Sequence, residues 1–136
     1  MKVSFFRDDT MSLLIKGLDA ASLRHQVTAN NLANLNTPNF KRSDVSFEDQ
    51  LLQARKQMDS PIARTHEKHF PLPPAPDLAP QVKTDQVTVR RIDGNNVDIE
   101  RDMLNMVSNQ LRYNAYVQRL NGRFDNWRFV INEGRR

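Results

Sequence analysis

Two long stretches of the chain place apolar residues at the spacing of an amphipathic helix. The first runs from about Thr10 to Leu35 and follows acids that can accept hydrogen bonds from the free amides of a helix start. Its apolar stripe alternates steps of three and four residues, which is the pattern of a coiled-coil seam. This seam consists of Met11, Leu14, Leu18, Ala21, His25, Thr28, Leu32 and Leu35. Ala21 would let a partner backbone approach closely, and His25 is interpreted as an interface or surface histidine.

The second stretch carries the clearest pattern in the sequence and begins near Asp98, whose carboxylate can cap a helix. Asp102 lies in the first turn, where the helix dipole favours a negative charge, and Gly134 is expected to close the helix. The seam consists of Met103, Met106, Gln110, Tyr113, Val117, Leu120, Phe124, Trp127 and Ile131. An apolar shoulder broadens its start and consists of Leu104, Val107 and Leu111. We predict that this helix packs against the N-terminal helix.

The first helix is expected to stop by Asn36. Pro38 disfavours the α conformation at Thr37, and asparagine can adopt the left-handed geometry of a helix C-terminal cap. Pro38 and Asn39 suit the two central positions of a tight turn, because proline fixes φ at the first and asparagine tolerates a positive φ at the second.

Asparagines are more frequent at this helix end than one cap requires. Asn30, Asn31 and Asn34 lie three and four residues apart, so they share one face of the helix. Capping explains part of this cluster. We expect the remaining amide groups to form hydrogen bonds between subunits.

The middle of the chain is predicted to be irregular. A shorter helix is expected over residues 43–58, with a capping-box-like start at Ser46. Prolines then recur from residue 60 to residue 80, which excludes a continuous helix or a central strand. Residues 86–92 are rich in β-branched side chains and precede an Asp93-Gly94 turn signal, so a short strand or hairpin arm is predicted there.

The predicted fold is mainly α, with long terminal helices packed as a coiled coil around an irregular proline-rich middle and a short β segment. We divide the chain into a flexible N-terminal segment (1–9), an N-terminal helical part of the core (10–58), a proline-rich loop with a β arm (59–94) and a C-terminal core helix (95–136). Each buried apolar side chain contributes about 1.5–3 kcal/mol, while ordering each residue costs about 1.5 kcal/mol. Two helices alone are therefore marginal, and we expect identical or related copies to cover their outer flanks.

Composition narrows the class of protein. The 136 residues allow about one domain, and the absence of cysteine excludes disulfides and thiolate metal sites. Arg7 interrupts the apolar N-terminus, so no cleavable secretory signal is predicted, and no stretch is apolar enough for a membrane-spanning helix. The 20 basic residues alternate with 16 acids to leave a net charge of +4. Their short basic pairs lack interleaved aromatic residues, so we predict no nucleic-acid partner.

The best candidate for chemistry is the segment from His66 to His69. These two histidines flank Glu67 in the proline-rich region, but no third metal ligand accompanies them. No nucleophile turn marks a serine hydrolase either. The sequence therefore predicts no catalytic or metal-binding residues, no cofactor, no small-molecule substrate and no enzymatic activity.

Two motifs resemble those of the flagellar basal-body rod family and related axial proteins. Residues 29–42, ANNLANLNTPNFKR, resemble the family's N-terminal signature, and residues 95–103, NNVDIERDM, resemble the start of its C-terminal helix. Asn39 stands where relatives often have glycine, which the turn geometry accepts. The short length is similar to that of the proximal rod members. The motif residues that the resemblance implies at subunit contacts are Ala29, Asn30, Asn31, Leu32, Ala33, Asn34, Asn36, Thr37, Pro38, Lys41 and Arg42.

The resemblance also implies a location and partners. Such proteins are exported by the flagellar type III apparatus without a cleaved signal peptide and form the periplasm-spanning rod of the bacterial flagellum. The implied partners are copies of the chain, other rod proteins, the rod-to-ring adaptor FliE, the inner-membrane ring and the export apparatus. The terminal helices would surround the export channel and transmit torque for motility. An export chaperone or adaptor, also helical and amphipathic, is the competing class, which would form a discrete soluble oligomer and bind many clients.

Overall fold

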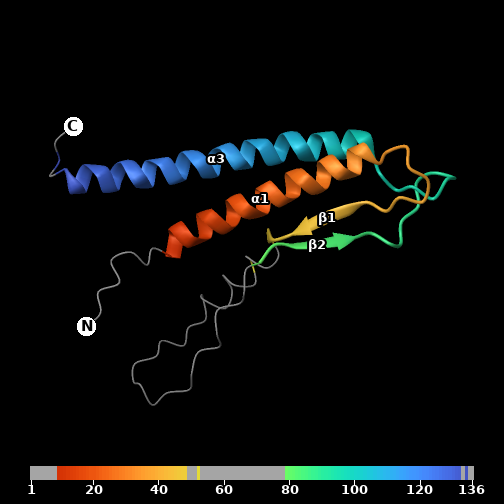
Figure 1. The fold of residues 1–136 in the computed structure, drawn as a ribbon, viewed down its shortest axis with the longest axis horizontal. Helices are drawn as coiled ribbons and strands as arrows, with labels where there is room; N and C mark the ends of the chain where they lie inside the picture. Colours follow the sequence, from red (N-terminus) through yellow and green to blue (C-terminus); the bar gives the residue numbers. More distant parts are fainter. Residues whose placement is uncertain (1–8, 49–51, 53–78, 133, 135–136) are drawn as a thin grey trace, which may run out of the picture.

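The computed structural model describes residues 9–48, 52, 79–132 and 134 (Figure 1). In chain order its regular elements are helix α1 (Asp9–Ala33), strand β1 (Ser43–Ser46), strand β2 (Gln81–Thr84) and helix α3 (Ile99–Ile131). The described part is mainly helical, with two long helices toward the chain ends and a two-stranded sheet between them in sequence. The predicted fold class is therefore confirmed.

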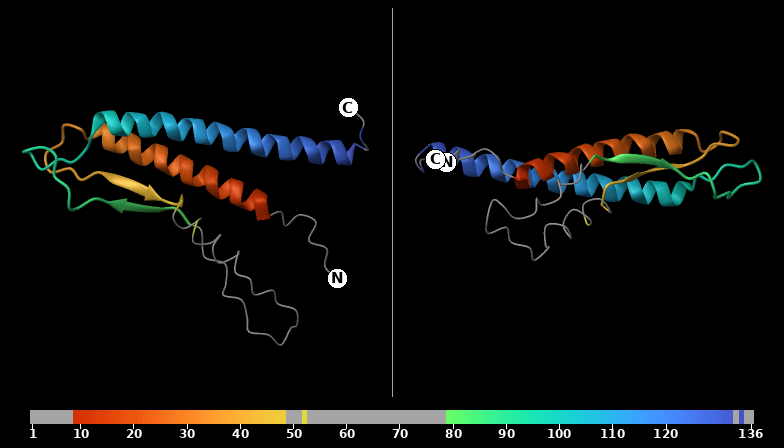
Figure 2. Two further views of the ribbon diagram at one scale, coloured as in Figure 1. Left: turned by 180° about the vertical axis from the view of Figure 1, so that it is seen from behind. Right: turned by 90° about the horizontal axis from the view of Figure 1, so that it is seen from below.

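Helices α1 and α3 lie side by side and run in opposite directions (Figures 1 and 2). At 1.5 Å per residue, the 25 residues of α1 span about 37 Å and the 33 residues of α3 about 50 Å. The end of α1 meets the start of α3 at one pole of the molecule, beside the connecting loops. At the opposite pole, the last turns of α3 extend past the start of α1 (Figure 1).

Small residues let the two helices approach closely. Gly17 of α1 faces the ring of Tyr116 on α3, and a Cβ atom added to this glycine would lie 3.2 Å from that ring. Further along, Asn109 Nδ2 donates a hydrogen bond of 2.8 Å to the backbone oxygen of Ala21, which is buried. Ala21 thus allows the close backbone approach that the sequence indicated.

The side of α3 that faces α1 is displaced from the predicted seam. The positions of α3 that are buried or half-buried include Asp102, Met106, Asn109, Tyr116, Val117, Leu120 and Trp127. The predicted seam positions that are exposed in the single chain are His25, Met103, Gln110, Tyr113, Phe124 and Ile131, and their place in a seam stays a prediction. The physical reason is that Asp102 and Asn109 form buried polar contacts, which turn their side of the helix inward and leave part of the apolar stripe outside.

The local signals at the helix ends are confirmed. Asp98 caps α3, because its side chain accepts a hydrogen bond of 3.2 Å from the backbone amide of Arg101. Asn39 has a φ of 59°, and the Phe40 amide donates to the Thr37 oxygen at 3.3 Å, which closes the predicted turn. After α3, the Gly134 amide returns to the Phe129 oxygen at 2.9 Å.

Of two predictions about the middle of the chain, one is wrong and the other is wrong in part. Residues 43–46 begin a strand rather than a helix, since β1 pairs antiparallel with β2 from Ser43 opposite Thr84 to Ser46 opposite Gln81. Burial of Val45 and Phe47 next to α1 favours this extended conformation. The second strand lies at residues 81–84, whereas the predicted 86–92 segment forms a loop. Residues 48 and 52 are helical, as predicted for the short helix. The remaining residues of the predicted short helix and proline-rich segment, 49–51 and 53–78, lie outside the described residues.

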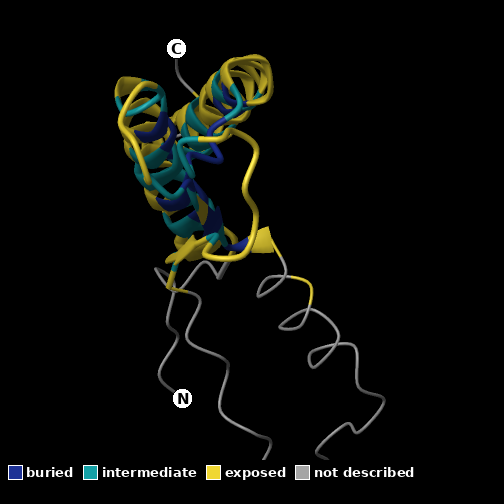
Figure 3. Ribbon diagram, turned by 90° about the vertical axis from the view of Figure 1, so that its right-hand side faces the viewer, coloured by how far each residue is buried: buried dark blue, intermediate teal, exposed yellow. Residues whose placement is uncertain are grey.

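The buried apolar core is small. It consists of Ala20, Ala21, Val45, Phe47 and Val97. Figure 3 shows that the buried residues gather on the inner sides of the helices, and that most of the outer surface of both helices is exposed. Apolar packing within one chain therefore fixes only part of this fold.

Candidate functional site

The largest fully buried side chains in the described part of the chain are polar: Asn31, Asn95 and Asp102. They lie where the end of α1, the loop to β1 and the loop to α3 converge. Buried polar groups are unfavourable unless hydrogen bonds satisfy them. We call this cluster the polar junction and define it as Asn31, Arg42, Asn95, Asn96 and Asp102.

Asn95 ties the α3 loop to the end of α1. Its Nδ2 donates to the backbone oxygens of Asn34, Leu35 and Thr37 at 3.1, 3.0 and 2.9 Å. Its Oδ1 accepts from the Val97 amide at 2.7 Å. One amide side chain thus joins the loop before α3 to three backbone carbonyl groups of the turn that follows α1.

Arg42 forms the centre of the polar junction. Its Nε donates to Asp102 Oδ1 at 2.8 Å in a buried ion pair, and its backbone amide donates to Asn96 Oδ1 at 2.6 Å. Asn96 Nδ2 reaches on to the Asp85 backbone oxygen and to Thr88 Oγ1, both at 3.0 Å. Removing one partner of such a buried pair leaves an uncompensated charge, so the pair specifies how the two halves of the chain meet.

Asn31 directs its amide group into the chain. Nδ2 donates to the Ser43 oxygen at 2.7 Å, and Oδ1 accepts from the Ser43 amide at 3.0 Å. Asn34 likewise makes local bonds, since its Nδ2 donates to the Asn30 oxygen and its Oδ1 accepts from Thr37 Oγ1. Asn31 and Asn34 thus make bonds within the chain, and the expectation that the asparagine cluster also bonds between subunits stays a prediction, with Asn30 its exposed member.

The loop between β2 and α3 is fastened to the polar junction by Lys41. Its Nζ donates to the backbone oxygens of Thr88 and Gly94, each at 3.1 Å. Within this loop, hydrogen bonds from the side chain and backbone amide of Thr88 lower the pKa of Asp85. The Arg101 amide lowers the pKa of Asp98, and the ion pair with Arg90 lowers it further. Both carboxylates are therefore ionised at neutral pH.

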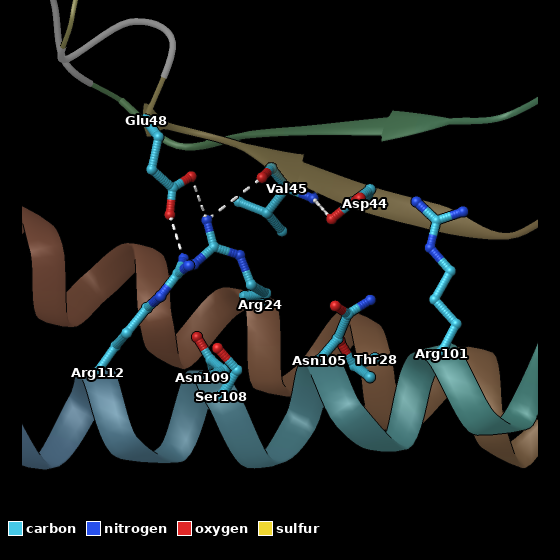
Figure 4. Close-up of a pocket in the computed structure, with 10 residues that line it drawn as sticks. All are labelled: Arg24, Thr28, Asp44, Val45, Glu48, Arg101, Asn105, Ser108, Asn109 and Arg112. Atoms are coloured by element: carbon cyan, nitrogen blue, oxygen red, sulfur yellow. Dashed lines mark hydrogen bonds and ion pairs between the residues drawn. The ribbon is translucent and has the colours of Figure 1, made fainter.

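A polar groove of about 220 Å³ lies beside the polar junction, between α1, β1 and α3 (Figure 4). Glu48 bridges Arg24 and Arg112 across it, with its carboxylate oxygens 2.6 and 2.8 Å from their guanidinium nitrogens. The groove is open and mainly charged, and these contacts join the end of β1 to both helices. The ion pairs across the groove hold the segment after β1 against α1 and α3.

The remaining motif residues surround the polar junction. Leu32 and Lys41 are half-buried, whereas the exposed members are Ala29, Ala33, Asn36, Thr37 and Pro38. No contact with another chain is described for them, so their part in subunit contacts stays a prediction.

Sequence reasoning missed the pairing of Arg42 with Asp102 and the central position of Asn95. Asp102 was assigned a role in the helix dipole alone. The available signal was the Asn95-Asn96 pair directly before a capped helix, because side-chain amides at a loop-to-helix boundary can satisfy backbone groups of another segment.

Other kinds of site find little support. Within residues 9–48, 52, 79–132 and 134, His, Asp and Glu side chains form no cluster of three that could hold a metal ion. The segment from His66 to His69 lies outside this part of the chain. A search of the described helices finds none with the length and apolar character needed to cross a membrane.

The chain is similar in sequence to known proteins of the flagellar basal body. The family model for flagella basal body rod proteins matches residues 11–41. The chain is 30% identical to the flagellar basal body rod protein FlgB of Bacillus subtilis, over 93% of this chain and 95% of that protein. It is 36% identical to FlgB of Borrelia hermsii over 79% and 84% of the two chains. For FlgB of Aeromonas hydrophila the values are 32%, 90% and 91%.

These similarities place the chain among the structural components of the bacterial flagellar basal body. Structural rod proteins of this kind are not a class of enzymes. Within this group, the chain belongs to the FlgB family of flagellar basal body rod proteins. The polar junction thus joins the two segments, 29–42 and 95–103, whose sequences resemble this family.

Proposed function

We propose that this chain is a self-assembling subunit of the proximal rod, joined to its own copies and to other rod proteins through its terminal helices. The assembled helices would form the shaft that surrounds the export channel and transmits torque. The rod-to-ring adaptor FliE and the inner-membrane ring would be neighbours at its base. The flagellar type III apparatus would export the chain without cleaving a signal peptide.

The observation that carries this proposal is the outer face of α3, defined as Met103, Leu104, Val107 and Leu111. These side chains are 56%, 71%, 61% and 66% exposed. They follow one another at helical spacing and lie away from the buried positions Asp102 and Asn109. A contiguous exposed apolar surface of this kind marks a protein interaction site.

The buried core of the single chain explains why such a surface is needed. Its apolar members are few and mostly small, so the helix pair gains little stability from its own packing. Covering the outer face of α3 would add about 25 cal/mol for each Å² of apolar surface removed from water. Assembly would therefore supply stability that the isolated chain lacks.

The first test is deletion of the gene in its own motile host, followed by electron microscopy of isolated basal bodies. Rings without a rod, restored by complementation, are expected. Complete basal bodies in the deletion strain would contradict the proposal and favour a chaperone or adaptor.

A sharper test changes the outer face alone. Val107→Asp and Leu111→Asp place a carboxylate where a neighbour's apolar surface should lie, so swimming and rod formation should be lost. Asn126→Asp, which is exposed on the same helix but lies off this stripe, is the matched control and should swim normally. The far-ultraviolet circular dichroism of the purified variants should equal that of the parent protein, because the substituted side chains are exposed. Normal motility of both outer-face variants would exclude this surface from assembly.

A further inference from the structure

A second groove lies between the start of α1 and the later turns of α3, at the pole away from the connecting loops. The two helices diverge toward the start of α1, and α3 continues past it (Figures 1 and 2). The groove between them has a volume of about 490 Å³. Thr10 and Leu14 line it from α1, and several residues of the 118–126 segment line it from α3.

The lining of this groove suits an aromatic occupant. Leu14 supplies an apolar side chain, and a Cβ atom added to Gly122 would meet nothing within 4 Å, so there is open space beside the α3 backbone. Arg119 also lines the groove, and it has no hydrogen bond or ion pair to any residue that the structure describes. An arginine side chain offers an apolar stem and a guanidinium plane on which an aromatic ring can stack.

The segment that precedes α1 carries such side chains and joins the chain at the groove. Residues 1–8 include Phe5 and Phe6, and Thr10 lines the groove. Phe6 is four residues before Thr10, so its backbone can lie up to about 14 Å away. The α3 side of the groove, residues 118–126, is about 12 Å long. Phe6 can therefore reach any part of it.

We propose that Phe5 and Phe6 pack into this groove, so that the N-terminal segment of the same chain covers the open end of the helix pair. A segment joined directly to the groove is present at an effective concentration on the order of millimolar, which favours it over a separate chain. Each phenylalanine removes a large apolar surface from water when it is buried. The contact belongs to the single chain and does not depend on the role in the rod.

Tryptophan fluorescence tests whether this pole is covered, because Trp127 is the one tryptophan of the chain. Trp127 is half-buried one turn beyond Arg123, and its ring centroid lies 5.8 Å from that of Phe124. The double variant Phe5→Ser with Phe6→Ser should uncover this end of α3. The emission maximum of Trp127 should then shift to longer wavelength, and acrylamide should quench it more strongly.

Ser4→Ala is the matched control for the fluorescence measurement. It changes the same segment without removing a large apolar side chain, so both signals should equal those of the parent protein. The far-ultraviolet circular dichroism of each variant shows whether the helices are retained.

Photochemical cross-linking identifies what the segment touches. The photoreactive residue p-benzoylphenylalanine is placed at position 6 of the full chain, where it keeps an aromatic ring. Labelled and unlabelled proteins are mixed and irradiated, so mass spectrometry separates links within one chain from links between chains. Links from position 6 to residues 118–126 of the same chain are expected. The same photoreactive residue at position 92, in the loop before α3 at the opposite pole, should give none of these links (Figure 1).

Three outcomes would overturn the proposal. The first is linkage of position 6 only to another chain, and the second is linkage within the chain only outside residues 118–126. The third is an unchanged Trp127 signal in the double variant. If that variant loses its helical signal, the cross-links decide, because the chain used for them keeps Phe5 and an aromatic ring at position 6. Each result leaves the deletion test of the rod function unaffected, so the two failures are distinguishable.

Discussion

The polar junction and the helix pair are held together in opposite ways. At the polar junction, Arg42 and Asp102 form a buried ion pair, and Asn95 makes several directed hydrogen bonds. Along the helix pair, the contact rests on small residues such as Gly17 and Ala21 and leaves much apolar surface outside. The polar junction is buried and held by directed polar contacts, whereas the helix pair has few buried apolar residues and much exposed apolar surface.

This difference assigns separate tasks to the two regions. Directed polar contacts are intolerant of a wrong partner, so the polar junction fixes how the two halves of one chain meet. Exposed apolar stripes are less selective but release free energy when a neighbour covers them. Changes at the polar junction should therefore destabilise the isolated chain, and changes on the outer helix surface should affect assembly with little effect on the isolated chain.

The largest effect on the isolated chain is expected from Asp102→Ala. Arg42 would keep a buried guanidinium without its main partner, which costs about 3–5 kcal/mol. A chain of marginal stability would then unfold, and its helical circular dichroism signal should be lost or its urea midpoint sharply lowered. The double variant Arg42→Met with Asp102→Leu removes both charges and should recover most of the loss. If the single and double variants are equally stable, the ion pair does not hold the polar junction.

Substitutions at Asn95 should have the next largest effect. Asn95→Ala removes the buried amide that joins the two segments and should cost about 1–3 kcal/mol. Asn95→Asp should be worse, because a carboxylate would then face the oxygens of residues 34, 35 and 37. Urea unfolding measures both losses. Asn114→Asp, on the exposed surface of α3, should change stability by less than about 0.5 kcal/mol. A loss of similar size at both asparagines would contradict a special role for the Asn95 hydrogen bonds.

Two glycines should respond in opposite directions to the same substitution. Gly94 has a φ of +82°, and a Cβ atom there would lie 2.5 Å from Asn39 Oδ1, so Gly94→Ala should destabilise by about 1–2 kcal/mol. Gly122 is inside α3 with nothing within 4 Å of the added atom, so Gly122→Ala should stabilise by about 0.5–1 kcal/mol. Thermal unfolding of the two variants should therefore shift to opposite sides of the parent transition. A shift in the same direction would contradict this contrast.

The smallest expected effect is a dependence of stability on pH near the polar junction. Asp85 and Asp98 have a lowered pKa in the folded chain, so their contributions are complete above the ordinary aspartate pKa and are lost as pH falls through the lowered values. The urea midpoint should be constant from about pH 7 to 5 and should decline below about pH 4. Asp98→Asn should reduce this decline. An unchanged profile in that variant would remove Asp98 from the explanation.

Local sequence signals predicted the helical part of this fold well. The Asp98 cap depends on a residue three positions away, and the Pro38-Asn39 turn depends on its own four residues. The limits of α1 and α3 follow from the same kind of signal. These features could be predicted because each is decided by neighbouring residues.

Features that depend on distant partners could not be predicted in this way. Ser43 begins a strand because Thr84 pairs with it, although the local pattern favours a helix. Asn95 and its acceptor Asn34 are 61 residues apart, and neither local sequence segment indicates that the other is its partner. The side of α3 that packs on α1 could not be predicted for a related reason. Apolar periodicity identified a stripe, but the partners of Asp102 and Asn109 decided which side of the helix turns inward.

The separation of Arg42 from Asp102 has a consequence for how the chain is made. Arg42 is translated 60 residues before Asp102, so the carboxylate that it pairs with is missing during that interval. An isolated helix such as α1 is marginal without a packing partner. The first half of the chain should therefore remain unfolded on the ribosome until the second helix has been synthesised. A product that terminates before Asn95 lacks three of the five residues of the polar junction and should not fold. Folding therefore requires that the second helix has been translated.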